Sequence, residues 1–198
     1  MTNFAEERAH RGVRLAPILA VLLLCMTPRP MQADGAGGLT ESQIKAGFIF
    51  NFLRFVEWPA KAFATPSSPI TVCVVGESPV TALLHEAVNG KAVEGRAIAV
   101  KHLQPGDESH GCHLVFVSAA EARHSGRMLE SLKGASVLTV GEVAGFSQSS
   151  GILNFSTQDN KVKLEINLDA AAHANLKVSA KLIAVSRLVN EKTTPGAN

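Results

Sequence analysis

Five polar residues on otherwise apolar segments are the strongest candidates for a functional site in this sequence. Asn51, Arg54 and Glu57 recur at every third position of one apolar stretch. Glu165 and Asn167 alternate with apolar residues along another. Polar groups on buried elements must be satisfied by one another or by a ligand. The sequence therefore predicts either an internal network between Arg54 and a carboxylate, or a pocket for a ligand or a protein partner.

Catalytic chemistry has little support among the other polar residues. No serine lies in a G-x-S-x-G turn, and Ser147, Ser149 and Ser150 belong to a polar loop. Glu57 and Glu165 are the carboxylates best placed beside apolar surface, but acid–base catalysis would require them to lie close together. We therefore expect a protein that is not an enzyme and has no catalytic residues.

The histidines lack the spacing of a metal site. His110, Cys112 and His113 form a cluster, with His102 before it and His124 after it in the chain. Alternate residues of a strand point to opposite faces, so Cys112 and His113 cannot readily share an ion. The first predicted strand is followed by only one glycine of a dinucleotide-binding pattern. We expect neither a metal nor another cofactor.

The first 33 residues have the pattern of an export signal. Three arginines precede the apolar run Leu15–Met26, which is short for a membrane span. Small residues at Ala33 and Ala36 allow cleavage near residues 33–36, which predicts a periplasmic protein. An uncleaved membrane tether and lipidation at Cys25 are the alternatives. Removal of this basic segment leaves a neutral chain, so nucleic-acid binding is not expected.

Cys73 and Cys112 are the cysteines that remain after the signal is removed. In an oxidising compartment an isolated pair most often forms one disulfide. The two cysteines lie in the first and third predicted strands, and adjacent strands would bring them within reach. A disulfide closing a loop of about 40 residues would stabilise the fold by roughly 2–4 kcal/mol. Two free buried thiols are the alternative.

The element that must position the polar stripe is a helix predicted between Leu39 and Pro59. Thr40 and Gln43 form a capping box at its start, and Pro59 ends it. Apolar residues cover most of its circumference, and six of the ten aromatic residues of the chain lie in it or just after it. Such a helix is predicted to be buried in the core.

The remainder of the chain predicts a single-domain α/β sandwich with a mixed β-sheet flanked by helices, over residues 39–190. A disordered tail is predicted for residues 191–198. The predicted strands are 70–75, 96–103, 112–117 and 136–140, followed by a hairpin of 152–156 with 161–168 around Asp159 and Asn160. The predicted helices begin at Ser78, at Ala119, at Asn167 or Asp169, and at Ser179.

Several of these segments, in this order, resemble the YfiR family of periplasmic proteins. The resemblance extends over about residues 40–190. The matching segments are Lys45–Phe52, Phe55–Pro59, Cys73–Gly76, Gly95–Arg96, Cys112–Val117, Leu138–Val140, Gly145–Phe146, Leu164–Asn167, Ala170–Ala171 and Leu176–Ser179.

The resemblance implies a non-enzymatic regulator that binds the periplasmic part of an inner-membrane diguanylate cyclase. Inhibition of that cyclase lowers cyclic di-GMP signalling and biofilm formation. It also implies sequestration by an outer-membrane lipoprotein, and a homodimer is a further hypothesis. Cys73 and Cys112 match two family cysteines, whereas a second pair found in some members is missing. The alternative hypothesis is a small-ligand binding module that reports to another membrane receptor.

Overall fold

The computed structural model describes residues 38–190, except for residues 105, 150 and 160. The chain divides into two compact units, Met1–Gly38 and Leu39–Asn198, and almost all described residues belong to the second. The predicted signal peptide and the predicted C-terminal tail lie outside the described residues.

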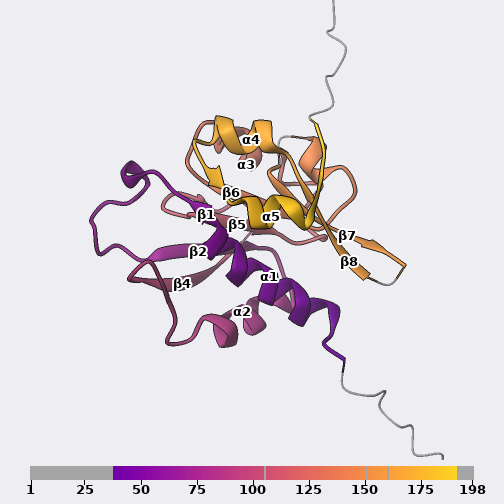
Figure 1. Ribbon diagram of the computed structural model, residues 1–198, viewed down its shortest axis with the longest axis horizontal. Helices are drawn as coiled ribbons and strands as arrows, with labels where there is room; N and C mark the ends of the chain where they lie inside the picture. Colours follow the sequence, from indigo (N-terminus) through magenta and orange to yellow (C-terminus); the bar gives the residue numbers. More distant parts are fainter. Residues whose placement is uncertain (1–37, 105, 150, 160, 191–198) are drawn as a thin grey trace, which may run out of the picture. The chain divides into compact units, whose positions relative to one another are not determined.

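A mixed β-sheet runs through the second unit (Figure 1). Within the described residues it has eight strands in the order β10-β8-β7-β6-β5-β2-β4-β3. Strands β4, β2, β5, β6 and β7 are parallel to one another, whereas β8 is antiparallel to β7. The bounds are β2 (Ile70–Val75), β3 (Ala92–Val93), β4 (Arg96–Leu103), β5 (Leu114–Val117), β6 (Leu138–Gly141), β7 (Leu153–Gln158), β8 (Lys161–Ile166) and β10 (Ser186–Leu188). Two short strands, β1 (Val56–Glu57) and β9 (Lys177–Val178), form a separate antiparallel pair.

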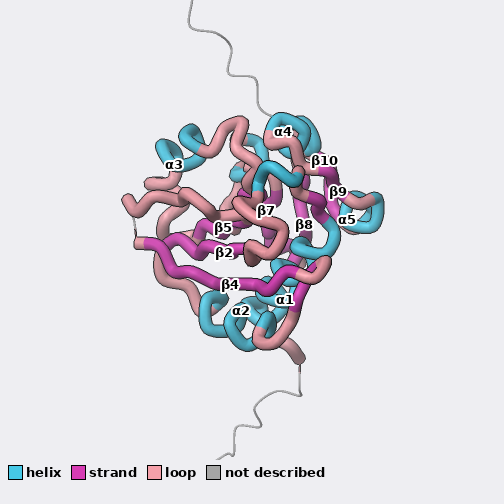
Figure 2. The backbone as a smooth tube through the Cα atoms, turned by 90° about the vertical axis from the view of Figure 1, so that its left-hand side faces the viewer, coloured by secondary structure: helices cyan, strands magenta, loops and turns pink. Residues whose placement is uncertain are grey.

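Helices cover the two faces of this sheet. They are α1 (Glu41–Phe55), α2 (Val80–Val88), α3 (Gly126–Ser131), α4 (Leu168–His173) and α5 (Ala180–Ala184), with short 3₁₀ turns at Ala60–Ala62 and Phe146–Gln148. Figure 2 shows α1 and α2 together on one side of β2, β4 and β5, and α3 on the other. The structure is thus the predicted α/β sandwich.

The alternation of side chains along β2 produces two apolar clusters. Val72 and Val74 pack into the cluster that contains Phe52 of α1, which is fully buried. Cys73 and Val75 point to the opposite face and join the cluster of α3. Every residue of β2 is buried, as the continuous apolar run predicts for a strand covered on both faces.

The predicted core helix begins as expected but ends earlier. Thr40 and Gln43 form the predicted capping box, with Thr40 Oγ1 accepting from the Gln43 N–H and Gln43 Oε1 from the Thr40 N–H. The helix stops at Phe55, because Val56 adopts an extended conformation and pairs with Val178 in β9. The prediction that helix continues to the residues before Pro59 is therefore wrong by one turn.

Two other differences concern short elements. Residues 119–124 form turns rather than the first half of the predicted helix, and α3 begins only at Gly126. The Ser125 hydroxyl donates to the Ala122 carbonyl, which closes a turn just before the helix. The helix expected from Ser179 ends at Ala184, and Leu188 lies in β10, where it pairs with Ile166 of β8. The β7–β8 hairpin itself is confirmed, with Asp159 in a left-handed conformation at its tip.

Candidate functional site

The predicted disulfide joins Cys73 to Cys112, with Cα atoms 5.9 Å apart. Strands β2 and β5 are parallel neighbours in the register Val72 to Leu114, and Cys112 lies two residues before β5, within reach of Cys73. Both cysteines are buried in the α3-side cluster. The bond therefore fixes the segment that enters β5 to β2.

Glu165 occupies the centre of a row of polar side chains across three neighbouring strands. The register places Asn154 of β7 on one side of it and Arg187 of β10 on the other. One carboxylate oxygen pairs with the Arg187 guanidinium. The other accepts hydrogen bonds from Asn154 Nδ2 at 3.1 Å and from the Ser147 hydroxyl at 3.4 Å. Glu165 is thus a buried charge with partners on both oxygens.

The pKa of Glu165 reflects two opposing effects. Burial raises the pKa, because it disfavours the charged form. The hydrogen bonds from Arg187, Asn154 and Ser147, together with the charge of Arg187, outweigh burial and hold the pKa below its ordinary value. The carboxylate is therefore ionised at neutral pH and stabilises the folded state in that form.

Asn167 links the same region to α4. Its Nδ2 donates to the Ser147 carbonyl at 2.9 Å, and its Oδ1 accepts from the Ala170 N–H at 2.9 Å as the N-cap of α4. Asn167 is fully buried, so this side chain satisfies groups on both sides of it. The predicted capping role of Asn167 is confirmed.

The loop that carries Ser147 is held by the preceding aromatic ring. Phe146 packs directly against Gly141 and Gly151, and a Cβ atom at either glycine would collide with the ring. Both positions therefore require glycine for close packing rather than for backbone freedom. This contact sets the position of Ser147 relative to Glu165 and Asn167.

The three polar residues predicted to lie on the first helix are in a different environment, with Asn51 and Arg54 on α1 and Glu57 on β1. Asn51 is half-buried, whereas Arg54 and Glu57 are exposed. The guanidinium that pairs with Glu165 is that of Arg187, not that of Arg54. Sequence reasoning missed Arg187 because it faces Glu165 only through β10, a strand without an apolar pattern. The only hint of Arg187 in the sequence is a basic residue after Ser179, the predicted start of the last helix. Basic residues are common at such positions on any protein surface, so this hint does not indicate a site.

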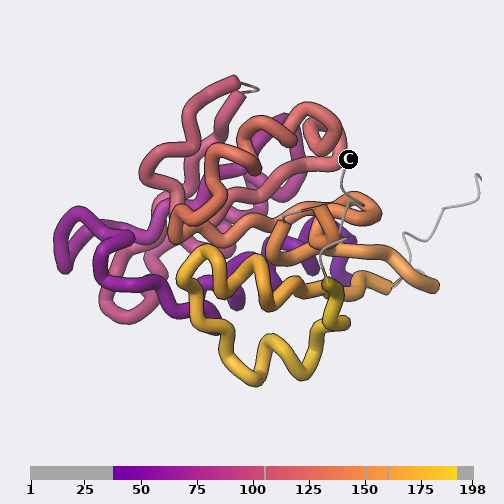
Figure 3. The backbone as a smooth tube through the Cα atoms, turned by 90° about the horizontal axis from the view of Figure 1, so that it is seen from above, coloured from indigo at the N-terminus to yellow at the C-terminus, as the bar shows by residue number. Residues whose placement is uncertain are grey.

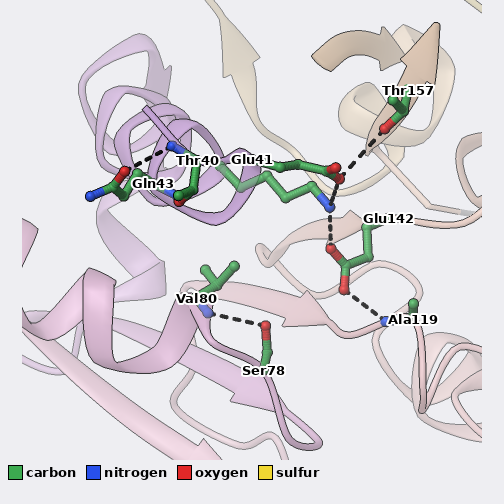
Figure 4. Close-up of polar contacts among 9 residues, drawn as sticks. Thr40, Glu41, Gln43, Ser78, Val80, Ala119, Glu142 and Thr157 are labelled. Atoms are coloured by element: carbon green, nitrogen blue, oxygen red, sulfur yellow. Dashed lines mark hydrogen bonds and ion pairs between the residues drawn. The ribbon is translucent and has the colours of Figure 1, made fainter. Parts of the chain in front are cut away.

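A second buried charge connects α1 to the sheet. Lys45 Nζ lies 2.6 Å from Glu41 Oε1 and 2.6 Å from Glu142 Oε2. The Glu142 carboxylate also accepts from the Ala119 N–H at 2.8 Å, and Thr157 donates to Glu41 (Figure 4). Burial lowers the pKa of Lys45, but the two carboxylates outweigh burial and raise it overall. Lys45 thus joins the start of α1 to the ends of β5 and β6.

His113 is a buried histidine with both ring nitrogens in use. Nδ1 accepts from the Thr71 N–H at 3.1 Å, so Nε2 carries the proton and donates to the Ala62 carbonyl at 3.1 Å. The ring stacks on Phe63, with centroids 4.5 Å apart. Burial lowers the pKa, the hydrogen bond to Ala62 opposes this, and the charge of Arg96 lowers it further. The net lowering makes His113 a neutral structural residue.

Three cavities among the described residues lie away from the predicted site. One of about 780 Å³ lies between residues 106–111 and α3, and one of about 470 Å³ lies beside α2 and β4. A third, of about 450 Å³, lies between α3, α4 and the start of β6. None of the five predicted site residues lines any of these three cavities. Within the described part of the chain, no three histidine, cysteine or carboxylate side chains converge as metal ligands would.

The chain matches the YfiR/HmsC-like family over residues 42–187, from the first turn of α1 into β10. It therefore belongs to this family, as the order of its sequence segments suggested. The family consists of periplasmic proteins of a regulatory kind. No curated protein matches the chain. Of the helices that the structure describes, none has the length and apolar character needed to cross a bilayer.

Proposed function

We propose that this protein is exported to the periplasm, binds the periplasmic part of an inner-membrane diguanylate cyclase and holds that enzyme inactive. Inhibition lowers cyclic di-GMP and, with it, biofilm formation. The observation that carries the proposal is the family match, which covers nearly the whole described domain. An inhibitor of this kind acts by binding alone, so the proposal assigns no catalytic residue to the chain.

The structure supports this role through the way the domain is held together. The disulfide between Cys73 and Cys112 suits an oxidising compartment, and the network around Glu165 fixes the opposite part of the sheet. A domain with little freedom to rearrange loses less conformational entropy on binding a partner. Such preorganisation favours an inhibitor that must hold an enzyme in one state.

For the contact surface we propose the stripe formed by Asn51 and Arg54 of α1 and Glu57 of the adjoining β1. Arg54 and Glu57 are exposed. Asn51, three residues before Arg54, is half-buried. Charged side chains at the rim of an interface steer association and select partners. By contrast, Glu165 and Asn167 have internal partners, which supports a role in positioning this surface rather than in direct contact.

The decisive experiment measures cellular cyclic di-GMP after deletion of the gene and after its restoration. We expect a rise on deletion that restoration reverses. Restoration with Arg54→Glu should fail to lower cyclic di-GMP, while the matched control Arg123→Glu, also an exposed arginine, should succeed. No rise on deletion would count against cyclase repression and favour the ligand-binding alternative. Equal behaviour of the two variants would remove the stripe from the proposal.

Export and assembly complete the proposal and need separate measurements. N-terminal sequencing of protein from the periplasm should place the new terminus near residues 33–36; an intact N-terminus would indicate a membrane tether. Size-exclusion chromatography with light scattering of the mature protein tests the homodimer. Co-purification with an outer-membrane lipoprotein under native extraction tests the second partner, and its absence would leave the cyclase as the one proposed target.

A further inference from the structure

The cavity between α3 and α4 has the lining of a small-molecule site. Its volume of about 450 Å³ lies within the range of ligand pockets. It is bordered by the C-terminal end of α3, the segment that leads into β6 and one face of α4; α3, α4 and β6 are labelled in Figure 1. The residues that line it are Leu129, Leu132, Lys133, Gly134, Val137, Thr139, Ile152, Ala170, His173 and Ala174.

The interior of this α3–α4 cavity is aliphatic. Leu129, Val137, Ile152 and Ala174 are buried side chains of the lining, and Leu132 is half-buried. The lining contains no aromatic ring other than the imidazole of His173. Branched aliphatic walls suit a flexible hydrocarbon chain, because a flat aromatic ligand would gain no stacking partner inside.

One buried polar group faces this interior. Thr139 is buried, and its hydroxyl oxygen accepts a hydrogen bond from the Ile152 N–H at 3.0 Å. The hydroxyl also carries a hydrogen, which can be donated to an acceptor in the cavity. The cavity therefore offers a hydrogen-bond donor in a mainly apolar wall, as ligand pockets commonly do.

The mouth of the cavity carries basic side chains. Lys133 and His173 are both exposed and come from opposite walls, one just after α3 and the other at the end of α4. Lys133 also pairs with Glu130 at 2.8 Å, but a salt bridge between exposed side chains contributes little, so a ligand carboxylate can compete for the ammonium. The lining itself contains no carboxylate. An anionic group on a ligand would therefore meet the Lys133 ammonium and the His173 imidazole at the mouth.

We propose that the α3–α4 cavity binds a small aliphatic carboxylate, with its hydrocarbon chain among Leu129, Val137 and Ile152 and its carboxylate at Lys133 and His173. The site is separate from the surface proposed for the cyclase and does not depend on it. The proposal follows from the volume, the aliphatic lining and the basic mouth taken together.

Octanoate is the probe that tests this site, with octan-1-ol and octylammonium as neutral and cationic controls. Titration of the mature protein, followed by calorimetry and methyl NMR, should show octanoate binding at least tenfold tighter than either control. The shift changes should centre on the methyl groups of Leu129, Val137 and Ile152. Equal binding of the three probes, or shift changes centred elsewhere, would overturn the proposal.

Two sets of variants separate the charge of the mouth from the cavity itself. Lys133→Met combined with His173→Gln should weaken octanoate binding about tenfold and leave octan-1-ol unchanged, whereas Lys163→Met on the exposed side of β8 should change neither. Ala174→Leu should fill the cavity and abolish binding of both. If that variant does not fold, Ala170→Leu at a half-buried position provides the same test. Unchanged octanoate binding in the double variant or in the filled cavity would contradict the assignment.

Discussion

Two regions of the sheet are stabilised by different chemistry: an apolar end around β2 and β5, on the side of β4 and β3, and a polar end at β7, β8 and β10. Around β2 and β5, apolar side chains fill both faces and a disulfide joins Cys73 to Cys112. Around β7, β8 and β10, a row of polar groups crosses the strands and centres on Glu165, with Arg187 at the edge. Figure 3 shows the yellow C-terminal segment beside the orange hairpin that it completes. One end depends on packing and a covalent bond, the other on directional bonds that require one register.

Because α1 packs against both ends of the sheet, truncation of a buried side chain of α1 should cause the largest loss of stability. Phe52 is fully buried and its ring stacks with Phe155 of β7 at 5.8 Å between centroids. Phe52→Ala should lower the free energy of unfolding by about 3–5 kcal/mol. Urea denaturation followed by circular dichroism measures this change. Leu39→Ala, at an exposed position before the helix, is the control, and equal stability of both variants would exclude α1 from the core.

The apolar end can be tested through its covalent bond. The double variant Cys73→Ala with Cys112→Ala should lose about 2–4 kcal/mol, because the unfolded chain regains the freedom of a long loop. Dithiothreitol should destabilise the native protein by a similar amount and leave the double variant unchanged. Denatured native protein should show no free thiol with Ellman's reagent. Two reactive thiols in protein taken from the periplasm would refute the disulfide.

The polar end can be tested by removing its central charge. Glu165→Ala leaves Asn154 Nδ2 and the Ser147 hydroxyl buried without their acceptor, which should cost about 1–3 kcal/mol. Arg187 is largely exposed and can turn to water, so the loss should be smaller than for a fully buried pair. Denaturation measures the loss, and Glu57→Ala, at an exposed carboxylate, should be nearly neutral. Loss of partner binding with unchanged stability would instead support a pocket at Glu165.

The same contrast explains what the sequence could predict. The apolar end follows from local patterns: Thr40 with Gln43 marks the start of α1, and the run Ile70–Val75 predicts a strand buried on both faces. Once these elements are placed, the pairing of Cys73 with Cys112 needs only that β2 be the neighbour of β5, the strand that follows Cys112. Short-range periodicity and an obligatory buried face therefore account for most of the fold.

The polar end depends on contacts between distant residues, which no local pattern encodes. Arg187 meets Glu165 because β10, with only three residues, pairs in parallel with β8. Likewise, the spacing of Arg54 and Glu57 indicates one helical face only if the helix continues. Pairing of Val56 with Val178 ends it first, so Glu57 lies on a strand. Long-range pairing thus overrides helical periodicity at the residues chosen for the candidate site.

A pH titration sharpens the comparison, because the ionisable groups of the two ends lose their contribution at different pH. His113 has a lowered pKa in the folded state, so the unfolded chain binds its proton first as the pH falls. Its contribution is complete above the ordinary pKa of 6.5 and decreases below it. Glu165 also has a lowered pKa, but its contribution decreases only below its ordinary value of 4.5.

Between pH 6.5 and 5, the native protein should therefore lose stability through His113, by less than about 1.4 kcal/mol per pH unit. His113→Gln should flatten this part of the curve, and His110→Gln, at an exposed histidine, should leave it unchanged. Glu165→Gln should keep the slope between pH 6.5 and 5 and reduce the slope below pH 4.5. A native-like slope in His113→Gln would mean that other groups cause the loss of stability and that His113 does not make this end of the sheet sensitive to acid.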